Sequence, residues 1–331
     1  MKTTSSISFK GQYPRSGDVA LLCEGDISGY ESSMIKAWCD TRTSLMVDVW
    51  PCGTENALFG MADAIGRTIG LVVVEDRDFR SNAEATRECK KKENDRRKRA
   101  VNIGVWKHWQ RNEIENYFLD SEIYAPVFAE FYGSNENEVR TALTEVIVSL
   151  APWQIVEAVV YEVRKCCSSD PSGILCNNLE RKPKIDKNMI CQPEIDSVER
   201  VFKKNWETYL DSAGKDVCEM DALSVYEEIT KQWVSVDYNS PIWRNDWAGK
   251  EVLSWLRKLM ACRYGWPPKD REIVDWSSMN NQKSGDLDRD IEKAMQPRLV
   301  NRFIDILSKG SGDQAVSVEW NELIDVIQNI K

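Results

Sequence analysis

The sequence predicts an α/β protein in which a parallel-sheet domain, residues 1–120, is followed by a mainly α-helical domain, residues 121–331. The first observation is a pair of apolar runs, at 18–24 and 71–74, whose composition suits strands buried on both faces. The second is the alternation of strand-like and helix-like segments before residue 120, which is typical of right-handed crossovers in a parallel sheet. The third is the change to helical spacing of apolar residues after residue 120.

The elements of the sheet domain are expected in alternating order. Thr54 suits the N-cap of a helix, and Gly70 opens the central strand. The segment 111–118 follows the last strand. The expected strands cover 18–24, 44–50, 71–74 and 101–108, and the expected helices cover 29–40, 55–67 and 81–99.

The second domain is expected to be built from helices joined by polar loops. The stretches 167–193 and 264–284 are rich in Pro, Ser, Asn and Lys, which favours loops. Six of the thirteen tryptophans lie between Trp233 and Trp276; a helical core or a partner interface is expected there, with base stacking as the alternative. The expected helices cover 121–131, 136–165, 194–211, 219–235, 247–262, 286–308 and 317–330.

Composition narrows the class of protein. Hydrophobic residues make up 42% and charged residues 29%, which is typical of globular domains, and no apolar run approaches the roughly 18 residues of a membrane span. The N-terminal Met-Lys-Thr-Thr-Ser-Ser has no apolar segment of a secretory signal, so the ten cysteines indicate reduced thiols in the cytoplasm. A single histidine, His108, excludes multi-histidine metal sites, and the cysteine spacing fits no zinc module.

Acidic residues follow both buried strands of the predicted sheet. Glu24 precedes Gly25 at the end of the first strand, and Asp76 and Asp78 follow the central strand. Side chains two apart on extended backbone point the same way, and the carboxyl ends of parallel strands meet at one edge, where ligands bind. Clustered carboxylates suit Mg²⁺ or Mn²⁺. The alternative is a solvated strand end with surface acids.

The residues between these acids are expected to have a different role. Glu75 and Arg77 alternate with Asp76 and Asp78, so their side chains should point to the opposite face of the strand. We expect Glu75 to be structural and Arg77 to pair with a neighbouring acid.

The ordered set of these motifs resembles a known family. An apolar strand with Glu24-Gly25, a second with Asp76-Arg-Asp78, and the later segment Arg111-Asn-Glu-Ile-Glu-Asn-Tyr-Phe118 are similar to the TOPRIM nucleases of the OLD-related group. Within that group, the sequence resembles the effectors of PARIS-type anti-phage defence systems. The resemblance is good over about residues 15–120 and faint elsewhere. It implies a Rossmann-like TOPRIM fold.

The resemblance also implies chemistry and partners. It implies two Mg²⁺ or Mn²⁺ ions held by Glu24, Asp76 and Asp78, with Glu115 completing the second site. It further implies a toxic nuclease, dimeric when active, that is held inactive by a separate ABC- or OLD-type ATPase and cleaves RNA such as tRNA. Consistent with a separate ATPase, the chain has no Gly-x-x-x-x-Gly-Lys-Ser/Thr loop.

Two features leave the second metal site open. Family members often carry an Asp four residues after the Glu that precedes the glycine, and here that position is Ser28, with Asp26 and Glu31 nearby. Glu115 has an alternative role as a glutamate that caps or salt-bridges a short helix.

Positive charge is concentrated directly after the central strand. Residues 80–111 contain eleven Lys or Arg and four Asp or Glu, although the whole chain has a net charge of −9. This stretch could follow a phosphate backbone, or it could be a solvated helix face. Lys250, in Gly249-Lys250, could also reach a phosphate or simply begin a helix. The proposed nucleic-acid-binding residues are Lys90, Lys91, Lys92, Arg96, Arg97, Lys98, Arg99 and Lys250.

The sequence therefore favours a Mg²⁺-dependent TOPRIM nuclease that acts as the toxic effector of an abortive-infection system. A DNA nuclease or nicking TOPRIM enzyme is the first alternative, although the zinc-ribbon cysteines and the tyrosine-bearing cleavage domain of its relatives are not evident. A catalytically silent TOPRIM module that binds a partner is the second.

Overall fold

The protein divides into two compact units, which are described separately. The computed structural model describes residues 17–25, 29–65, 69–99, 104–167, 170–177, 179, 184–186, 189–191, 195–213, 220–233, 241–266, 270 and 272–330. The first unit comprises Met1–Gln110 and Leu307–Lys331, and the second comprises Arg111–Ile306. This division lies ten residues before the predicted domain boundary at residue 120, and the end of the chain groups with the first unit.

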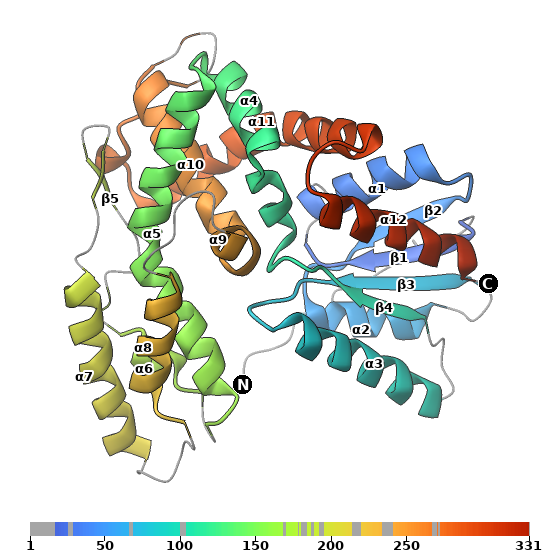
Figure 1. Cartoon of the computed structure of the whole chain (residues 1–331), viewed down its shortest axis with the longest axis horizontal. Helices are drawn as coiled ribbons and strands as arrows, with labels where there is room; N and C mark the ends of the chain where they lie inside the picture. Colours follow the sequence, from blue (N-terminus) through green and yellow to red (C-terminus); the bar gives the residue numbers. More distant parts are fainter. Residues whose placement is uncertain are drawn as a thin grey trace. The chain divides into compact units, whose positions relative to one another are not determined.

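The first unit is an α/β/α sandwich around a four-stranded parallel sheet in the order β2-β1-β3-β4. Helices α1 and α12 lie on one face of the sheet, and α2 and α3 lie on the other (Figure 1). The predicted α/β class with a parallel sheet is confirmed. Its elements are β1 (Val19–Cys23), α1 (Tyr30–Arg42), β2 (Val47–Pro51), α2 (Glu55–Ala64), β3 (Gly70–Glu75), α3 (Asn82–Lys98), β4 (Val105–His108) and α12 (Gln314–Asn329).

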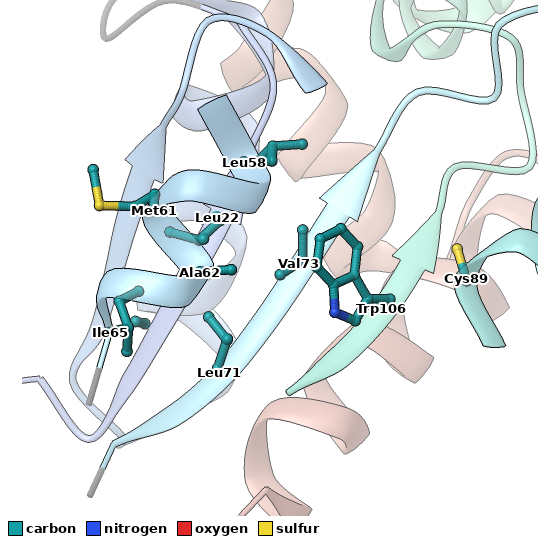
Figure 2. Packing of buried hydrophobic residues seen from close by; sticks show 10 residues of the cluster. Leu22, Leu58, Met61, Ala62, Ile65, Leu71, Val73, Cys89 and Trp106 are labelled. Carbon is teal, nitrogen blue, oxygen red and sulfur yellow. The ribbon is translucent and has the colours of Figure 1, made fainter. Parts of the chain in front are cut away.

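The core between the sheet and helices α2 and α3 explains why β1 and β3 are continuously apolar. Alternate residues of each strand face this layer, where Figure 2 shows Leu22, Leu71 and Val73 packed with Trp106. The remaining residues of β1 and β3 face α1 and α12, and all five residues of β1 are buried. Because helices cover both faces of the sheet, the central strands have no solvent-facing side and show no alternation of polar and apolar residues.

Helix α12 completes the layer on the other face of the sheet. The sequence did not predict that this helix belongs to the sheet unit. Trp38 of α1 donates its indole N–H to the carbonyl of Trp320 at 2.9 Å. Trp109, just after β4, stacks on the Trp320 ring with 4.8 Å between centroids. The last expected helix, 317–330, exists, but it belongs to the sheet unit because its tryptophan is part of that layer.

The second unit is helical, with one short hairpin. Helix α5 is a long core helix, and 67% of its most apolar window is buried, although its length and composition alone would suit a membrane span. The 3₁₀ helices, the short helices α6 and α9, and the hairpin were not predicted. The elements are η1 (Ile114–Leu119), α4 (Ser121–Tyr132), α5 (Glu136–Arg164), α6 (Ser172–Leu175), β5 (Lys184–Asp186), β6 (Met189–Cys191), α7 (Ile195–Ala213), α8 (Ala222–Trp233), α9 (Pro241–Asp246), α10 (Gly249–Tyr264), η2 (Trp276–Ser278) and α11 (Asn281–Lys309).

Candidate functional site

The carboxyl edge of the sheet gathers acidic residues from β1 and β3. The parallel register pairs Leu22 with Val73, so Glu24 lies level with the end of β3, where Asp76 follows. Glu24 and Asp76 are both half-buried. Burial raises the pKa of the Cys23 thiol, and the negative charges of Glu31, Asp76 and Glu24 raise it further. The register thus brings Glu24 and Asp76 to the same edge of the sheet, as the strand pattern predicted, and the charge of Glu31 also acts on the end of β1.

Glu31 is a fourth acid of this edge that the sequence did not single out as a site residue. It lies in the first turn of α1, is only 4% exposed, and accepts a hydrogen bond from Trp109 Nε1 at 2.7 Å. Its charge also raises the pKa of the Cys52 thiol, which burial raises to about 12. The sequence did contain a signal for this position: Glu31 is the second residue of α1 and lies on the helix face of the apolar Met34, Ile35 and Trp38. Asp26 and Ser28 lie outside the described residues.

The backbone after β3 is a tight left-handed turn, which corrects the predicted extended geometry. The strand ends at Glu75, and Asp78 and Phe79 have φ values of 49° and 60°. Asp78 is exposed. Residues other than glycine rarely hold such φ values, and they do so most often where a site requires it. Alternation along a strand therefore does not determine where Asp78 points relative to Asp76.

The other two residues of this segment are interior, which agrees with the structural role expected for Glu75, whereas the expected pairing of Arg77 with an acid stays a prediction. Glu75 is fully buried and accepts hydrogen bonds from Lys92 Nζ at 2.5 Å and Cys89 Sγ at 3.4 Å. Arg77 is 6% exposed and donates from Nη1 to the carbonyl of Arg80 at 2.7 Å. Glu75 is therefore a structural group, and Arg77 stabilises the backbone of its own turn.

The donor types at the sheet edge suit a hard divalent cation, since Glu24, Glu31, Asp76 and Asp78 offer only carboxylate oxygens. Within the described ranges, however, no three His, Cys, Asp or Glu side chains lie close enough together to hold a metal ion. Asp78 has the most room to move because it is exposed, whereas Glu24 and Asp76 are half-buried and Glu31 is buried. A bound cation would require these side chains to turn inward.

The basic stretch of α3 divides into interior and exposed residues. Lys92 pairs with Glu75, and Arg96, 4% exposed, pairs with Asp63 and donates to the carbonyl of Ala62 at 2.9 Å. The prediction that Lys92 and Arg96 contact nucleic acid is therefore corrected: both bind the inner surface of their own unit. Of the proposed contact residues in this stretch, those left exposed are Lys90, Lys91, Arg97, Lys98 and Arg99, and Arg87 of α3 is exposed as well.

The exposed cations are also farther from the acids than their sequence position indicated. Helix α3 begins at the carboxyl edge of the sheet, and its capping box joins Ser81 and Glu84 there. It then runs back toward the edge where the strands start (Figure 1). At 1.5 Å per residue, Arg97 lies about 24 Å along the axis from Ser81. Only an extended substrate could contact both the acids at the carboxyl edge and the exposed cations near Arg97.

Glu115 belongs to the second unit, in η1. Burial raises its pKa, and the charge of Glu292 acts in the same direction, whereas Lys250 and Arg257 lower it. Glu115 thus lies near Lys250, which is exposed in the first turn of α10. Two proposed site residues therefore lie near each other. Their position near the start of α10 also fits the alternative, in which a glutamate and a lysine support a helix end.

Asn116 and Gly249 show what the Glu-Asn-Tyr and Gly-Lys segments do in the second unit. The amide of Asn116, fully buried, donates to the carbonyls of Trp247 and Arg244 at 2.9 and 2.8 Å. A Cβ on Gly249 would lie 2.6 Å from Asn116 Oδ1. Glu113 accepts a hydrogen bond from the Lys250 backbone N–H at 2.9 Å. The two segments form one structural contact between η1 and α10.

A cleft of about 490 Å³ follows the edge strand β4, between α3 and α12. His108 lies in it, and burial lowers the pKa of its imidazole. Two carboxylates accept hydrogen bonds from backbone N–H groups along this edge. Glu93 accepts from Trp106 N at 2.9 Å, and Glu319 accepts from Gln110 N at 2.7 Å. Such capping protects an edge strand from pairing with another chain.

We found no match to a protein-family model, to a curated protein or to a solved structure.

Proposed function

We propose that this chain is a Mg²⁺- or Mn²⁺-dependent phosphodiester hydrolase with a TOPRIM-type site. The observation that carries the proposal is the arrangement of Glu24 after β1 and Asp76 after β3 at the same carboxyl edge of a parallel sheet, with the buried Glu31 in the first turn of α1 and Asp78 on the left-handed turn after Asp76. In open α/β sheets this edge is where ligands bind. A set of hard oxygen donors at that edge has few uses apart from a divalent cation.

In this proposal the chain's own residues hold and orient the reacting groups. Asp76, Asp78 and Glu24 would bind the cation, which supplies charge stabilisation and an activated water when bound. Glu31 is buried and oriented by Trp109, so it would add a fixed carboxylate behind the cation ligands. Glu115 lies in the other unit, so its part in this site stays a prediction of the resemblance.

The biological setting that we propose follows from the sequence resemblance. The chain would act in the cytoplasm as the toxic effector of an anti-phage system. An ABC- or OLD-type ATPase would restrain it, and it would cleave RNA such as tRNA as a dimer. The exposed cations Lys90, Lys91, Arg97, Lys98 and Arg99 could follow the phosphate backbone of an extended RNA, which repeats a charge every few ångströms.

The test is metal-dependent cleavage by Asp76→Asn. We expect the variant to lose activity on RNA by at least about 100-fold, because removing a ligand should do at least as much as removing a group that supports one. Asp40→Asn is the matched control, since Asp40 is an exposed acid of the same unit that pairs with Lys36 at 3.3 Å in a surface i,i+4 bridge.

The assay should include RNA and DNA, with Mg²⁺, Mn²⁺ and chelator, and Mn²⁺ binding measured in parallel. Cleavage of DNA alone would favour the nicking or DNA-nuclease alternative. Unchanged Mn²⁺ binding by Asp76→Asn, together with no cleavage by the parent, would favour the silent interaction module.

A further inference from the structure

We infer that Arg80 is a positioning residue for the proposed metal site: its guanidinium holds the Asp76–Phe79 turn in the left-handed conformation that presents Asp76 and Asp78. The inference rests on the proposed function, because it concerns the affinity of that same site for a divalent cation. Arg80 is only 7% exposed, so it is not available to bind substrate in the manner of a surface arginine.

Arg80 binds the backbone of the turn at several points. Its Nη2 donates to the carbonyl of Asp76 at 2.5 Å, and its Nε donates to the carbonyl of Arg77 at 2.7 Å. The Arg77 carbonyl also accepts from the Arg80 backbone N–H at 3.1 Å. Arg77 returns a hydrogen bond from its own side chain to the Arg80 carbonyl. The two arginines thus close the segment that contains Asp78 and Phe79.

The guanidinium is itself anchored to α3 and to the end of β3. Its Nη1 donates to Glu88 at 2.5 Å and lies 3.9 Å from the buried Glu75. Glu75 is in turn fixed by Lys92 at 2.5 Å. Arg80 therefore connects β3 and α3 to two carbonyls of the turn. The planar guanidinium can donate to several acceptors in fixed directions, which a lysine ammonium does less well.

The turn needs such support because its backbone is unfavourable without it. Positive φ at two successive residues other than glycine, Asp78 and Phe79, persists only where the surroundings impose it. Loss of the Arg80 hydrogen bonds would let these residues return to ordinary φ values. Asp78 and the Asp76 carboxylate would then be redirected, although both would still be present.

The experiment measures Mn²⁺ binding by the full-length chain, with electron paramagnetic resonance, and thermal stability for each variant. We expect Arg80→Met to weaken Mn²⁺ binding about 10- to 100-fold, as is usual when a group supporting a metal ligand is removed. Arg80→Lys should weaken it less, because one ammonium can replace one of the two carbonyl hydrogen bonds. If Arg80→Met does not fold, Arg80→Lys decides.

The matched control is Arg96→Met. Arg96 is an equally buried arginine of the same unit that also binds a carbonyl and an acid, but these partners, Ala62 and Asp63, belong to α2 rather than to the turn. The variant should lose stability like the Arg80 variants but keep the Mn²⁺ affinity of the parent. A purely structural role for Arg80 predicts that both arginines behave alike, and that result would overturn the inference.

Asp76→Asn separates failure of the inference from failure of the proposed function. If Asp76→Asn loses Mn²⁺ binding while both Arg80 variants keep it, only the positioning role is wrong. If Asp76→Asn binds Mn²⁺ as the parent does, the proposed metal site is wrong, and the inference fails with it.

Discussion

The Asp76–Phe79 turn of the first unit and the η1–α10 contact of the second are both built from short polar motifs, but they use their side chains in opposite ways. In the turn, Asp78 is exposed, and the backbone holds unfavourable φ values. In the η1–α10 contact, Asn116 is fully buried and donates to two backbone carbonyls, and Gly249 leaves no room for a Cβ.

This difference separates a motif that serves a site from a motif that serves the architecture. Buried polar side chains with good hydrogen bonds stabilise the packing around them, and their loss costs stability. Asp78 is exposed on a turn with unfavourable φ values, and such backbone occurs most often where a site requires it. Both motifs contributed to the sequence resemblance, yet only the first lies at the sheet edge where open α/β sheets bind ligands.

The largest stability effect is expected at the η1–α10 contact. Gly249→Ala should destabilise the second unit by about 2–3 kcal/mol, because its Cβ would collide with the fixed Asn116. Urea unfolding followed by tryptophan fluorescence would measure this. Gly285→Ala, in α11 of the same unit, is the control: a Cβ there meets nothing within 4 Å, so it should stabilise by about 0.5–1 kcal/mol. Equal effects would mean that the η1–α10 contact is loose.

The turn should respond in the opposite sense. Asp78→Gly should raise the free energy of unfolding by about 1 kcal/mol, because glycine holds a φ of 49° without strain, and it should abolish metal-dependent cleavage. Asp78→Asn, which tolerates the same φ, should remove activity with little change in stability. Thermal melts and cleavage assays on the three proteins check this. Loss of stability in Asp78→Gly would show that the carboxylate supports folding.

The sequence predicted the parallel sheet and the meeting of Glu24 and Asp76, because apolar strands and the parallel-edge rule depend only on local pattern. The left-handed turn at Asp78 could not be predicted in this way, since its cause lies in hydrogen bonds from Arg80 that no periodicity reveals. The place of α12 was missed for a similar reason: the pattern of an amphipathic helix does not indicate which domain it covers.

The interior cations of α3, by contrast, carry a signal in the sequence. Ala85, Cys89, Lys92 and Arg96 follow one another at spacings of four, three and four residues, which define one helix face. The first two are apolar and buried, so the face extends to Lys92 and Arg96. Helical periodicity therefore predicts the position of these two residues better than their charge does.

Glu115 tests which kind of motif the Glu-Asn-Tyr segment is. Its raised pKa means that the folded protein favours the protonated acid, so the ionised form reduces stability as pH rises above the ordinary value of 4.5. Glu115→Gln should therefore stabilise the protein at pH 7, with the gain shrinking as the pH falls toward 4, and should leave cleavage largely intact. Urea unfolding at the two pH values measures this. Strong loss of cleavage with no pH-dependent gain would return Glu115 to the catalytic site.

Neighbouring cations at the end of α3 differ in the same way: Arg96 is in an interior ion pair, whereas the next three cations are exposed. The smallest change in stability is expected for the exposed ones. Replacing the exposed Arg97, Lys98 and Arg99 with Gln should leave stability nearly unchanged and reduce the log–log salt slope of RNA binding by about 0.7 for each phosphate that is no longer neutralised. Arg96→Gln removes a charge one residue earlier, but from an interior ion pair. It should lower stability and leave the slope as it was.

Both variants should be titrated from about 50 to 200 mM salt in the Asp76→Asn background, so that substrate is not consumed. A slope that falls only in the triple variant assigns the far end of α3 to the substrate, about 24 Å along the helix from Ser81, and requires an extended RNA. A slope that stays constant in both would make these cations a solvated helix face. The substrate contacts would then have to come from other exposed cations, with Lys90 and Lys91 the nearest on α3.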